Sequence, residues 1–575
     1  MVHGSDFGIS EILLENLRAL ARHDRRLVER LLWPVAGDHV RIDPDGTGHY
    51  RCHREFVRFT VPDCDIAPLL GQLGRGGCGC GGGGGGDVLA FGVGLGELLE
   101  PLLAEWPQRR IVAWDRDPWL LRQMLIARDF SEALAAGRLT LELGADILDL
   151  LESPRQLEIV AHPFLAQVYR WELHCLEHGI GGRRVALAPG SLLTDDLAQS
   201  LRETGYTVFP IEVQRWSAEE LGYAVQRIDP QFVACVNYTV GLTEFCRSAG
   251  RPLLVWEIDP TTDHSIACSG STDHAHVFTY LRRNVEHFRR AGFQHAEYLP
   301  LATDTRHRRP LELDSLEQRR FGSPVSFVGS SLVDDAVGHR EQLCALYADW
   351  HTDGADALPE FRASLREVLD RQRAQLPQWI LPELMQQSFG EFLSAIGASG
   401  ETADPVALLG ETLASERRLE WMASLASAVP ESVQVWGDAG WKTLEAQGVR
   451  YRGAAGHGDE LTRIYNATAI NVDIGRLYQA DMVTMRVFDV LACGGFVITQ
   501  RSAALDELFE VGVELEAYSS LGELCEKVAY YLAHQDEARD IAKRGLAAVR
   551  ERHDVRSRVR HMLTSMGLGR ATIPA

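Results

Sequence analysis

Short apolar runs alternate with helical patterns along most of the chain. The runs hold three to five mostly apolar residues, the length and character of strands in a parallel sheet. Between them, leucine and valine recur at helical spacing. This β-α-β alternation predicts an α/β protein built on parallel sheets. The expected strands are residues 88–91, 110–114, 139–143, 185–188, 207–209, 232–236, 253–257, 275–278, 298–300, 325–328, 433–437, 449–453, 469–472 and 496–499.

The strands group into three Rossmann-like units, which set the expected domains. Residues 1–175 combine an amphipathic helical segment at 8–33 with a first, methyltransferase-like unit. Residues 176–322 form the second unit, and residues 323–575 form the third. Inside the third unit, residues 336–425 have an almost continuous helical pattern, so we expect a helical insertion there. Residues 74–86 are mostly glycine, which favours a flexible loop.

Composition places the chain among ordinary globular proteins and narrows its partners. It has 575 residues, 45% hydrophobic and 24% charged, with a formal net charge of −22. That balance argues against general nucleic-acid binding, which needs a basic surface, but it leaves room for a local basic pocket. No apolar run reaches the ~20 residues of a membrane helix, and the acidic N-terminus does not resemble an export signal. With 11 mostly scattered cysteines, a cytoplasmic location is expected.

The segment with the most chemistry is residues 484–499, TMRVFDVLACGGFVIT. It predicts a short apolar helix, a turn at Gly494-Gly495 and a buried strand. Arg486 and Asp489 are three residues apart and so are neighbours on one helix face. A guanidinium suits a phosphate and a carboxylate suits a ribose diol. The alternative is an ion pair on a core helix that ends in glycine.

Further candidates in the third unit lie at strand ends, where α/β sheets bind ligands. Gly329, Ser330 and Ser331 follow the first strand, and small residues there would let backbone N–H groups approach a diphosphate. The same pattern also fits a tight turn. Arg340, in the next helix, either neutralises phosphate or is solvated. Two more candidates border the polar loop that leads to Arg486, and these are Asn471 and Thr484.

In the second unit, Glu257 and Asp259 end a buried strand in the sequence WEIDP. Residues two apart face the same way on an extended chain. Such a pair could include a general base for an acceptor hydroxyl, or it could simply cap a loop. The nearby Asp273-His-Ala-His276 has possible metal spacing, but the sequence fixes no third ligand, so no metal site is expected.

The first unit carries a glycine turn directly after its first strand. Gly92, Gly94 and Gly96 form that turn, and Asp115 ends the next strand. An acidic residue about 20 positions after such a turn is where a ribose-binding carboxylate lies in dinucleotide folds.

Several motifs in order resemble the CgeB-type (spore-maturation-protein-like) glycosyltransferases. IYNATAINV, TMRVFDVLACGGFVIT and the closing IAKRGLAAVRERHDVRSRV resemble the C-terminal domain of that family. PLLVWEIDP, AGFQHAEYLPLATD and PVSFVGSS resemble the domain before it. The resemblance spans about residues 205–560, interrupted by the helical insertion. It implies a two-domain glycosyltransferase of the GT-B type, whose C-terminal domain binds a nucleotide-diphosphate sugar.

By position in these motifs, the resemblance implies a role for each candidate. Arg486 would contact the diphosphate, and Asp489 the ribose or sugar hydroxyls, although many relatives of this fold keep a glutamate there. Gly494 and Gly495 would let the backbone approach the donor, and the Gly329-Ser330-Ser331 loop would close over it. Side chains and helix dipoles, not a metal or other cofactor, would stabilise the leaving diphosphate. The acceptor implied is a hydroxyl of a protein such as flagellin, or of a surface glycan.

The N-terminal third resembles two kinds of domain. FGVGLGELLEPLL followed by IVAWDRDP is similar to the nucleotide-fold domain that precedes motility-associated flagellin glycosyltransferases. It is also similar to a class I methyltransferase. That second resemblance implies S-adenosylmethionine (SAM) at Gly92, Gly94 and Gly96, with Asp115 or Asp117 at its ribose, and hence a bifunctional protein. The alternatives are a ligand-free copy of the fold, or a chain that binds nucleotide sugars as a non-catalytic scaffold.

Overall fold

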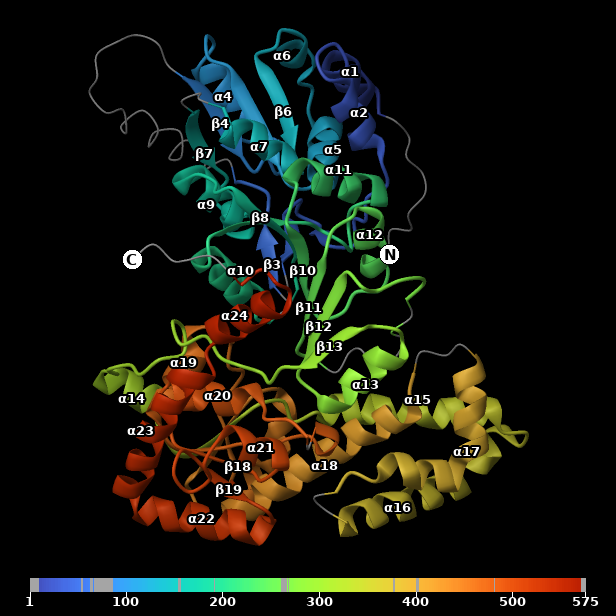
Figure 1. Cartoon of the computed structure of the whole chain (residues 1–575), viewed down its shortest axis with the longest axis vertical. Coiled ribbons are helices and arrows are strands. Elements are labelled where there is room, and N and C mark those ends of the chain that lie inside the picture. Colours follow the sequence, from blue (N-terminus) through green and yellow to red (C-terminus); the bar gives the residue numbers. More distant parts are fainter. Residues whose placement is uncertain are drawn as a thin grey trace.

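Three parallel sheets follow one another along the long axis of the molecule (Figure 1). In this computed structural model, the described residues are 10–52, 55–62, 66, 86–153, 157–190, 192–259, 266, 268–375, 378–399, 403–479 and 481–569. Most of the glycine tract expected to be a flexible loop therefore lies outside the described residues. A small antiparallel sheet accompanies the first unit, and its strands are β1 (Val40–Ile42), β2 (Gly48–Cys52) and β3 (Glu55–Arg58).

The N-terminal unit has a four-stranded parallel sheet of order β6-β5-β4-β7. The amphipathic segment at its start is two helices, α1 (Glu11–Leu20) and α2 (Arg25–Leu32), because Asp24 caps the second by accepting from the amide of Leu27 at 2.8 Å. The other elements are β4 (Asp87–Phe91), α4 (Leu99–Glu105), β5 (Ile111–Asp115), α5 (Pro118–Ala127), α6 (Ser131–Ala135), β6 (Leu139–Leu143), α7 (Ile147–Leu151), β7 (Leu157–Ala161), α8 (Leu165–Val168) and α9 (Arg170–His178).

The middle unit is a six-stranded parallel sheet of order β13-β12-β11-β10-β8-β9. Its central strands are fully buried and apolar except for Glu257 at the end of β11, as expected for a sheet covered by helices on both faces. The elements are β8 (Arg183–Ala188), α10 (Thr194–Glu203), β9 (Tyr206–Pro210), α11 (Ala218–Ile228), β10 (Phe232–Val236), α12 (Leu242–Ser248), β11 (Leu253–Glu257), β12 (Ala275–Thr279), α13 (Arg282–Arg290) and β13 (His295–Tyr298).

The C-terminal unit is a second six-stranded parallel sheet, of order β16-β15-β14-β17-β18-β19. Its strands and the helices around them are α14 (Ser315–Phe321), β14 (Ser323–Val328), β15 (Val433–Trp436), β16 (Arg450–Tyr451), α19 (Asp459–Ala467), β17 (Thr468–Val472), α20 (Met485–Ala492), β18 (Val497–Gln500), α21 (Ala503–Leu508), β19 (Glu516–Tyr518), α22 (Leu521–Ala533), α23 (Gln535–Arg552) and α24 (Val555–Ser565).

Four helices between β14 and β15 form the insertion expected from the sequence. They are α15 (Val333–Trp350), α16 (Leu358–Ala374), α17 (Leu381–Ser399) and α18 (Pro405–Ala428). An apolar core of their own, centred on Phe361, Met385 and Phe392, holds the insertion together. The last part of α18 differs, because Met422 and Leu425 pack into the core of the C-terminal sheet. The insertion is therefore anchored to the sheet through α18.

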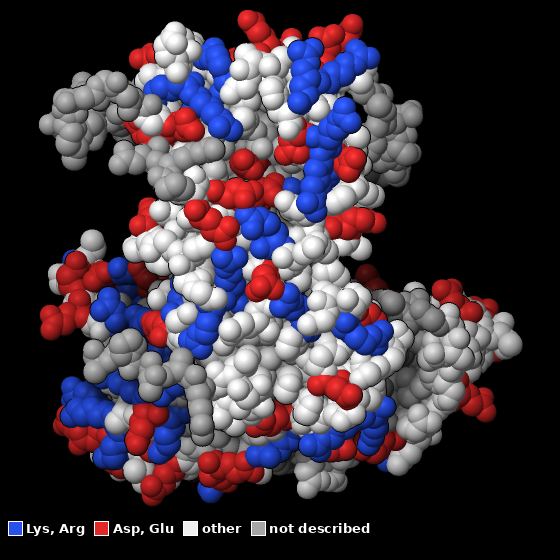
Figure 2. All heavy atoms as spheres, turned by 45° about the horizontal axis from the view of Figure 1, so that its top comes forward, with Lys and Arg blue, Asp and Glu red and all other residues white. Residues whose placement is uncertain are grey.

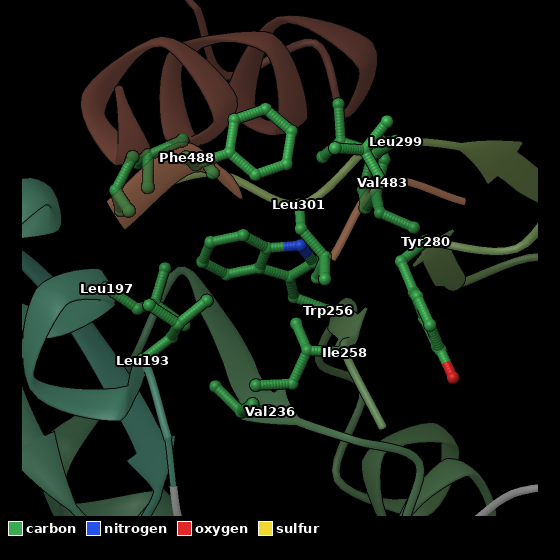
Figure 3. Close-up of a cluster of buried hydrophobic side chains, with 14 of the residues drawn as sticks. Leu193, Leu197, Val236, Trp256, Ile258, Tyr280, Leu299, Leu301, Val483 and Phe488 are labelled. Carbon is green, nitrogen blue, oxygen red and sulfur yellow. The ribbon is translucent and has the colours of Figure 1, made fainter. Parts of the chain in front are cut away.

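The middle and C-terminal units meet at the carboxyl ends of their strands. Trp256 and Ile258, at the end of β11, share one buried apolar cluster with Leu301, Val483 and Phe488 (Figure 3). The final helix α24 leaves the C-terminal unit and packs on α10 of the middle unit (Figure 1). Two Rossmann-like sheets that face each other in this way, with the last helix crossing back, form the GT-B architecture.

The surface drawn in Figure 2 carries acidic and basic side chains interspersed. None of the described helices is long and apolar enough to cross a membrane. Seven cysteines are free thiols, namely Cys175, Cys235, Cys246, Cys268, Cys344, Cys493 and Cys525, and several of them are buried.

Candidate functional site

The candidate site lies at the carboxyl edge of the C-terminal sheet, where α20 begins. Thr484 is the residue before α20, and Arg486 lies in its first turn. The Arg486 guanidinium donates from Nε to the carbonyl oxygen of Val328 at 2.6 Å and binds the Asp473 carboxylate through Nη1. It also lies 4.8 Å from the centre of the Phe327 ring. The Arg486 side chain is 17% exposed, so a ligand at this edge can reach it.

Asp473 holds this arrangement in place from the end of β17. It is buried, and besides Arg486 it accepts hydrogen bonds from Thr484 Oγ1 at 3.1 Å and Thr499 Oγ1 at 2.8 Å. A buried carboxylate with three donors fixes the position of each of them. Two successive strand ends and the start of α20 are thus tied to one carboxylate.

The insertion contributes two further arginines to the same edge, from α18. Arg418 donates from Nη1 to the carbonyl oxygen of Ser330 at 2.7 Å. Burial, with the positive charges of Arg486 and Arg476, lowers the pKa of Arg418 to about 9. Arg417 stacks on Trp421, with its guanidinium carbon 4.1 Å from the ring centre. Positive charge therefore accumulates here beyond what Asp473 offsets.

Arg417 is the least satisfied of these cations. It is only 5% exposed. Its Nη2 donates to Gln500 Oε1 at 3.0 Å, whereas its Nε and Nη1 have no hydrogen-bond partner among the residues that the structure describes. Burial lowers the pKa of Arg417. A buried cation with free donors is costly unless a ligand completes its contacts.

The Gly329-Ser330-Ser331 loop is held beside these arginines by Asp438. Ser330 Oγ and the Ser331 amide donate to the Asp438 carboxylate at 2.5 Å and 2.6 Å. Trp441 Nε1 donates to the carbonyl oxygen of Gly329 at 2.8 Å. A Cβ atom on Gly329 would lie 2.7 Å from Arg486 Nη2, so glycine is what allows the guanidinium to approach the loop.

A narrow pocket opens at this edge, with a cavity of about 20 Å³. That volume holds about one water molecule. The pocket lies between the polar loop before α20 and the end of β18. The residues that line it are Asp473, Gly475, Arg476, Gln479, Met482, Val483, Thr484, Thr499, Gln500, Ser502 and Leu505.

Several predicted residues lie away from this edge. Arg340 is half-exposed on α15 and pairs with Glu416 at 2.5 Å, so it does not neutralise a ligand in the pocket. Asn471 is buried and donates to the carbonyl oxygen of Phe496 at 3.2 Å, a contact that supports the strand pair β17–β18. Gly494 and Gly495 follow the C-terminal end of α20, at the opposite edge of the sheet from Arg486. The expectation that they let the backbone approach the donor is therefore wrong.

The Asp489 carboxylate is buried and contacts other side chains of the protein. It is 7% exposed, accepts from Thr303 Oγ1 at 2.5 Å, and lies 3.3 Å from Arg308 Nε. Thr303 and Arg308 belong to the segment that joins the middle and C-terminal units. In this structure Asp489 ties α20 to that segment, and the expected contact with ribose or sugar hydroxyls is not available.

The two carboxylates predicted in the middle unit have separate surroundings. Glu257 is fully buried and accepts from Asn284 Nδ2 at 3.2 Å. It therefore cannot reach an acceptor, and its expected role as a general base is wrong. Asp259 lies beyond the end of β11, is partly exposed, and accepts from Asn237 Nδ2 at 3.2 Å. Only Asp259 remains open to a substrate.

The glycine turn of the N-terminal unit is filled by the protein itself. Gly92, Gly94 and Gly96 all have positive φ angles, which explains why the turn needs glycine. Side chains of His162 and Leu165 lie within 3.2 Å of a Cβ built on Gly92. The turn therefore does not open on a ligand site.

Asp115 is likewise occupied. It is fully buried and accepts from the amides of Val93 and Asp117, each at 2.9 Å, and from Tyr169 Oη at 2.6 Å. Burial raises its pKa to about 7. Both carboxylate oxygens are used internally, so the predicted contact with a ribose is wrong, and the geometry favours a ligand-free copy of the fold over a SAM site.

The possible metal spacing at Asp273–His276 does not gather ligands. His274 Nε2 lies 2.9 Å from the carbonyl oxygen of Thr243, and His276 stacks on His295. Elsewhere among the described residues, Asp196, Asp304 and His307 approach one another closely enough for a metal ion. Asp304 is already bound by Arg306 Nε at 2.8 Å, so this group is explained by an ion pair.

Three arginines at this edge could not be predicted from the sequence. Arg417 and Arg418 lie inside the insertion, where helical periodicity gives no sign that one end reaches the sheet. Arg476 lies in a polar loop without a distinctive spacing. Asp473 does carry a signal in the sequence, because it directly follows the strand Thr468–Val472.

Comparison with known proteins points to one enzyme class. The family described as "Glycosyl transferase-like" matches residues 417–564, about a quarter of the chain. That stretch begins at Arg417 and includes Asp438, Asp473 and Arg486. No curated protein matches the chain. With the two-sheet architecture, the family match indicates a glycosyltransferase of the GT-B fold.

Three solved structures are similar over most of their own length. A glycosyltransferase from Rickettsia africae ESF-5 has 9% sequence identity and a TM-score of 0.41, covering 68% of this chain and 99% of its own. Anabaena HepE, solved with UDP-glucose, has 12% identity and a TM-score of 0.40, covering 67% and 99%. Sucrose-phosphate synthase from Thermosynechococcus elongatus has 10% identity and a TM-score of 0.37, covering 67% and 97%. At these scores the likeness assigns neither residue roles nor a ligand.

Proposed function

We propose that this protein transfers a sugar from a nucleotide-diphosphate sugar to a hydroxyl acceptor. The diphosphate would lie at the carboxyl edge of the C-terminal sheet, next to Arg486, Arg418 and Arg417. The observation that carries the proposal is the excess of positive charge at this edge. Among the described residues, Asp473 and Glu411 are the carboxylates that pair with the guanidinium groups of Arg417, Arg418, Arg476 and Arg486, whereas Glu420 and Asp489 act on these cations only at longer range.

A diphosphate would satisfy what this site lacks. Its oxygens are acceptors for the free donors of Arg417, and its charge offsets the repulsion that lowers the pKa of Arg418. Positive charge placed where negative charge grows on the leaving group stabilises the transition state more than the ground state. Arginine side chains would thus do the work for which other transferases use a metal ion.

Asp259 is the candidate for the base that accepts the proton of the acceptor hydroxyl. It lies just beyond the carboxyl end of β11 in the middle sheet, is partly exposed, and is oriented by Asn237. The resemblance to CgeB-type and motility-associated enzymes makes a protein such as flagellin, or a surface glycan, the acceptor to test first. The domain boundaries 1–175, 176–322 and 323–575 are part of this proposal.

The first test is a thermal-shift panel of nucleotide sugars on the wild type, Arg486→Lys and Arg418→Ala. A ligand that binds only the native state raises its stability by about 2.7 kcal/mol at a concentration 100 times Kd. We expect one nucleotide-diphosphate sugar to raise Tm of the wild type and to lose most of that effect in both variants. Arg340→Ala is the control, because it removes an exposed arginine of the same unit that lies away from the site.

The rates of donor hydrolysis and of sugar transfer measure the catalytic role of Arg486 directly. Removing one group that stabilises a developing negative charge costs about 10²–10³ in kcat. Arg486→Lys keeps the charge and loses the paired donors of the guanidinium, so turnover is expected to fall by up to that factor. If no nucleotide sugar shifts Tm, or if Arg486→Lys and Arg340→Ala behave alike, the assignment of the donor site is wrong.

Removal of divalent ions tests the role given to the arginines. Because arginine side chains offset the diphosphate charge in this proposal, the turnover rate in EDTA is expected to equal the rate in Mg²⁺. A loss of activity in EDTA that Mg²⁺ restores would contradict that role.

A further inference from the structure

A second cavity, of about 490 Å³, lies between the N-terminal and middle units. Its floor is the carboxyl edge of the middle sheet, where β8 ends in Ala188 and β10 ends in Val236. The N-terminal unit supplies the opposite wall, with His39, Tyr50 and Arg51. The volume is within the usual range of small-molecule sites, roughly 300–1,000 Å³. The proposed donor site contributes none of the residues that line it.

Basic side chains dominate the charged lining of this cavity. Four arginines line it, against the carboxylates of Asp38 and Glu212. Arg116 is neutralised by Glu172, with Nε and Oε1 2.6 Å apart, and by Glu212 at 3.1 Å. Arg170 pairs with Asp195. Arg215 lies 3.6 Å from Glu212, so Arg51 is the lining arginine without an ion-pair partner among the described residues.

Arg215 is held rigidly, and Arg51 is free to bind. Arg215 donates from Nη1 to Tyr50 Oη at 2.7 Å and from Nη2 to the carbonyl oxygen of Arg51 at 2.8 Å. The exposed Arg51 guanidinium has no ion-pair or hydrogen-bond partner among the described residues. Arg215 is therefore a fixed part of the cavity wall, and Arg51 has hydrogen-bond donors that are available to a ligand.

Two further features of the wall favour an anion. His39 is only 3% exposed, its Nε2 lies 2.6 Å from Asp117, and its Nδ1 has no hydrogen-bond partner within the described part of the chain. The amino end of α9 also opens here, because Val168, Arg170 and Trp171 line the cavity, and Tyr169 gives that helix no side-chain cap. The amino end of a helix attracts negative charge.

We propose that this cavity is a second ligand site, for a small polar molecule that carries a phosphate or carboxylate group. Arg51 and the amino end of α9 would hold the oxyanion, and His39 and Asn237 would contact polar groups on the rest of the ligand. The proposal is independent of the donor site. It also gives the N-terminal unit a role in binding, although its own glycine turn is filled.

Thermal shift with three related sugars tests the site on the full chain. Glucose 6-phosphate and glucuronate carry the two candidate oxyanions, and glucose is the neutral reference. We expect one of the charged sugars to raise Tm with saturation at millimolar concentration, and glucose to have no effect. The charged sugar that acts identifies the oxyanion.

Two variants place the effect in this cavity. Arg51→Ala removes the free guanidinium, and Gln214→Glu adds a negative charge at an exposed lining position. Each is expected to weaken binding of the active sugar by roughly tenfold or more. Arg22→Ala, at an exposed arginine of the same unit, is the matched control.

The outcomes separate this proposal from the donor site. Arg486→Lys is expected to keep the full response to the charged sugar, because its site is elsewhere. The proposal is overturned if neither charged sugar shifts Tm, if glucose acts equally well, or if both cavity variants respond like Arg22→Ala. If no nucleotide sugar raises Tm but the charged sugar still does, the donor site is refuted and the site in this cavity is not.

Discussion

At the scale of single residues, Arg417 shows a cost to stability that only a ligand would remove. It is buried with two nitrogen atoms unsatisfied among the described residues, although its guanidinium stacks on Trp421. Replacing a buried charge by an apolar side chain of similar volume is often neutral or stabilising. Residues of this kind are characteristic of binding sites that trade stability for function.

Arg417→Met is therefore expected to separate stability from binding. Methionine keeps the packing on Trp421 and removes the unpaired cation, so the free energy of unfolding in urea should stay level or rise by about 1 kcal/mol. Affinity for the donor, measured by calorimetry, should fall by about tenfold, the value of one charge-assisted hydrogen bond. Arg340→Met is the control. A fall in stability together with unchanged affinity would make Arg417 a structural residue.

Glu142 predicts a pH dependence of stability. Burial, with the negative charges of Asp146, Asp149 and Asp24, raises its pKa to about 8, whereas the unfolded value is 4.5. A raised carboxyl pKa means that the folded state holds a proton that the unfolded chain has lost. The contribution of Glu142 to the free energy of unfolding is therefore fully present at pH values below its unfolded pKa. It falls as the pH rises towards 8.

Glu142→Gln cannot ionise and removes this slope. At about pH 9 the variant should be more stable than the wild type by about 2 kcal/mol, and the difference should shrink towards pH 5. Urea unfolding at several pH values measures it, provided that the signal reports the N-terminal unit. Equal pH profiles for the two proteins would show that Glu142 ionises as freely in the folded state as in the unfolded chain.

At the scale of elements, α20 explains why residues of one motif lie at opposite edges of the sheet. In a β-α-β unit the helix begins at the carboxyl edge of the sheet and ends at the amino edge. Arg486 and Thr484, at the start of α20, therefore lie at the carboxyl edge, where we propose the donor site. Gly494 and Gly495, at its end, cannot do so, although they adjoin the same helix in sequence.

The glycine pair is expected to matter for folding and not for the donor. A Cβ on Gly495 would lie 2.9 Å from Val490 Cγ1 and 3.1 Å from Asn471 Nδ2. Gly495→Ala should therefore destabilise the protein by about 1–3 kcal/mol. Gly494 has a φ of 74°, so Gly494→Ala should cost about 1 kcal/mol through backbone strain. Donor affinity, measured on the folded fraction, should be unchanged, and a loss as large as that in Arg418→Ala would restore the glycines to the site.

The strand pattern was predictable where strands are buried on both faces. The central strands Phe232–Val236 and Leu253–Glu257 were predicted with their observed limits, because each contains four or five consecutive apolar residues. The edge strand β19, Glu516–Tyr518, was missed because three residues are too few to show a period. The strand Leu157–Ala161 was also missed, since its glutamate interrupts the apolar run.

At the scale of the whole molecule, the sequence predicted the units and their order but not the face on which they meet. Trp256 and Phe488 are separated by more than 200 residues, and each alone fits an ordinary core position. Only the packed structure shows that they close the space between the two sheets (Figure 3). The same holds for Arg418, which reaches Ser330 from the far end of the insertion.

This closed interface has a consequence for donor binding. The pocket beside Asp473 has a cavity of about 20 Å³, whereas sites for ligands of nucleotide size hold roughly 300–1,000 Å³. If the proposed donor binds at this edge, the edge has to widen, and we expect it to do so by a movement of the middle unit away from the C-terminal unit. The free energy of the apolar contacts around Trp256 opposes that movement, and apparent affinity is reduced by the fraction of molecules that are closed.

Trp256→Leu is expected to tighten donor binding while it destabilises the fold. Loss of the indole removes contacts with the apolar cluster and should lower the free energy of unfolding by about 2–4 kcal/mol. Part of this free energy is lost only in the closed arrangement, in which Trp256 packs between the two units. The open arrangement is then more populated, so the apparent Kd for the donor should decrease several-fold. Trp114→Leu is the matched control, because Trp114 is equally buried but lies in the N-terminal unit. Calorimetry compares the two variants, and equal donor affinities would mean that the interface around Trp256 does not restrain opening.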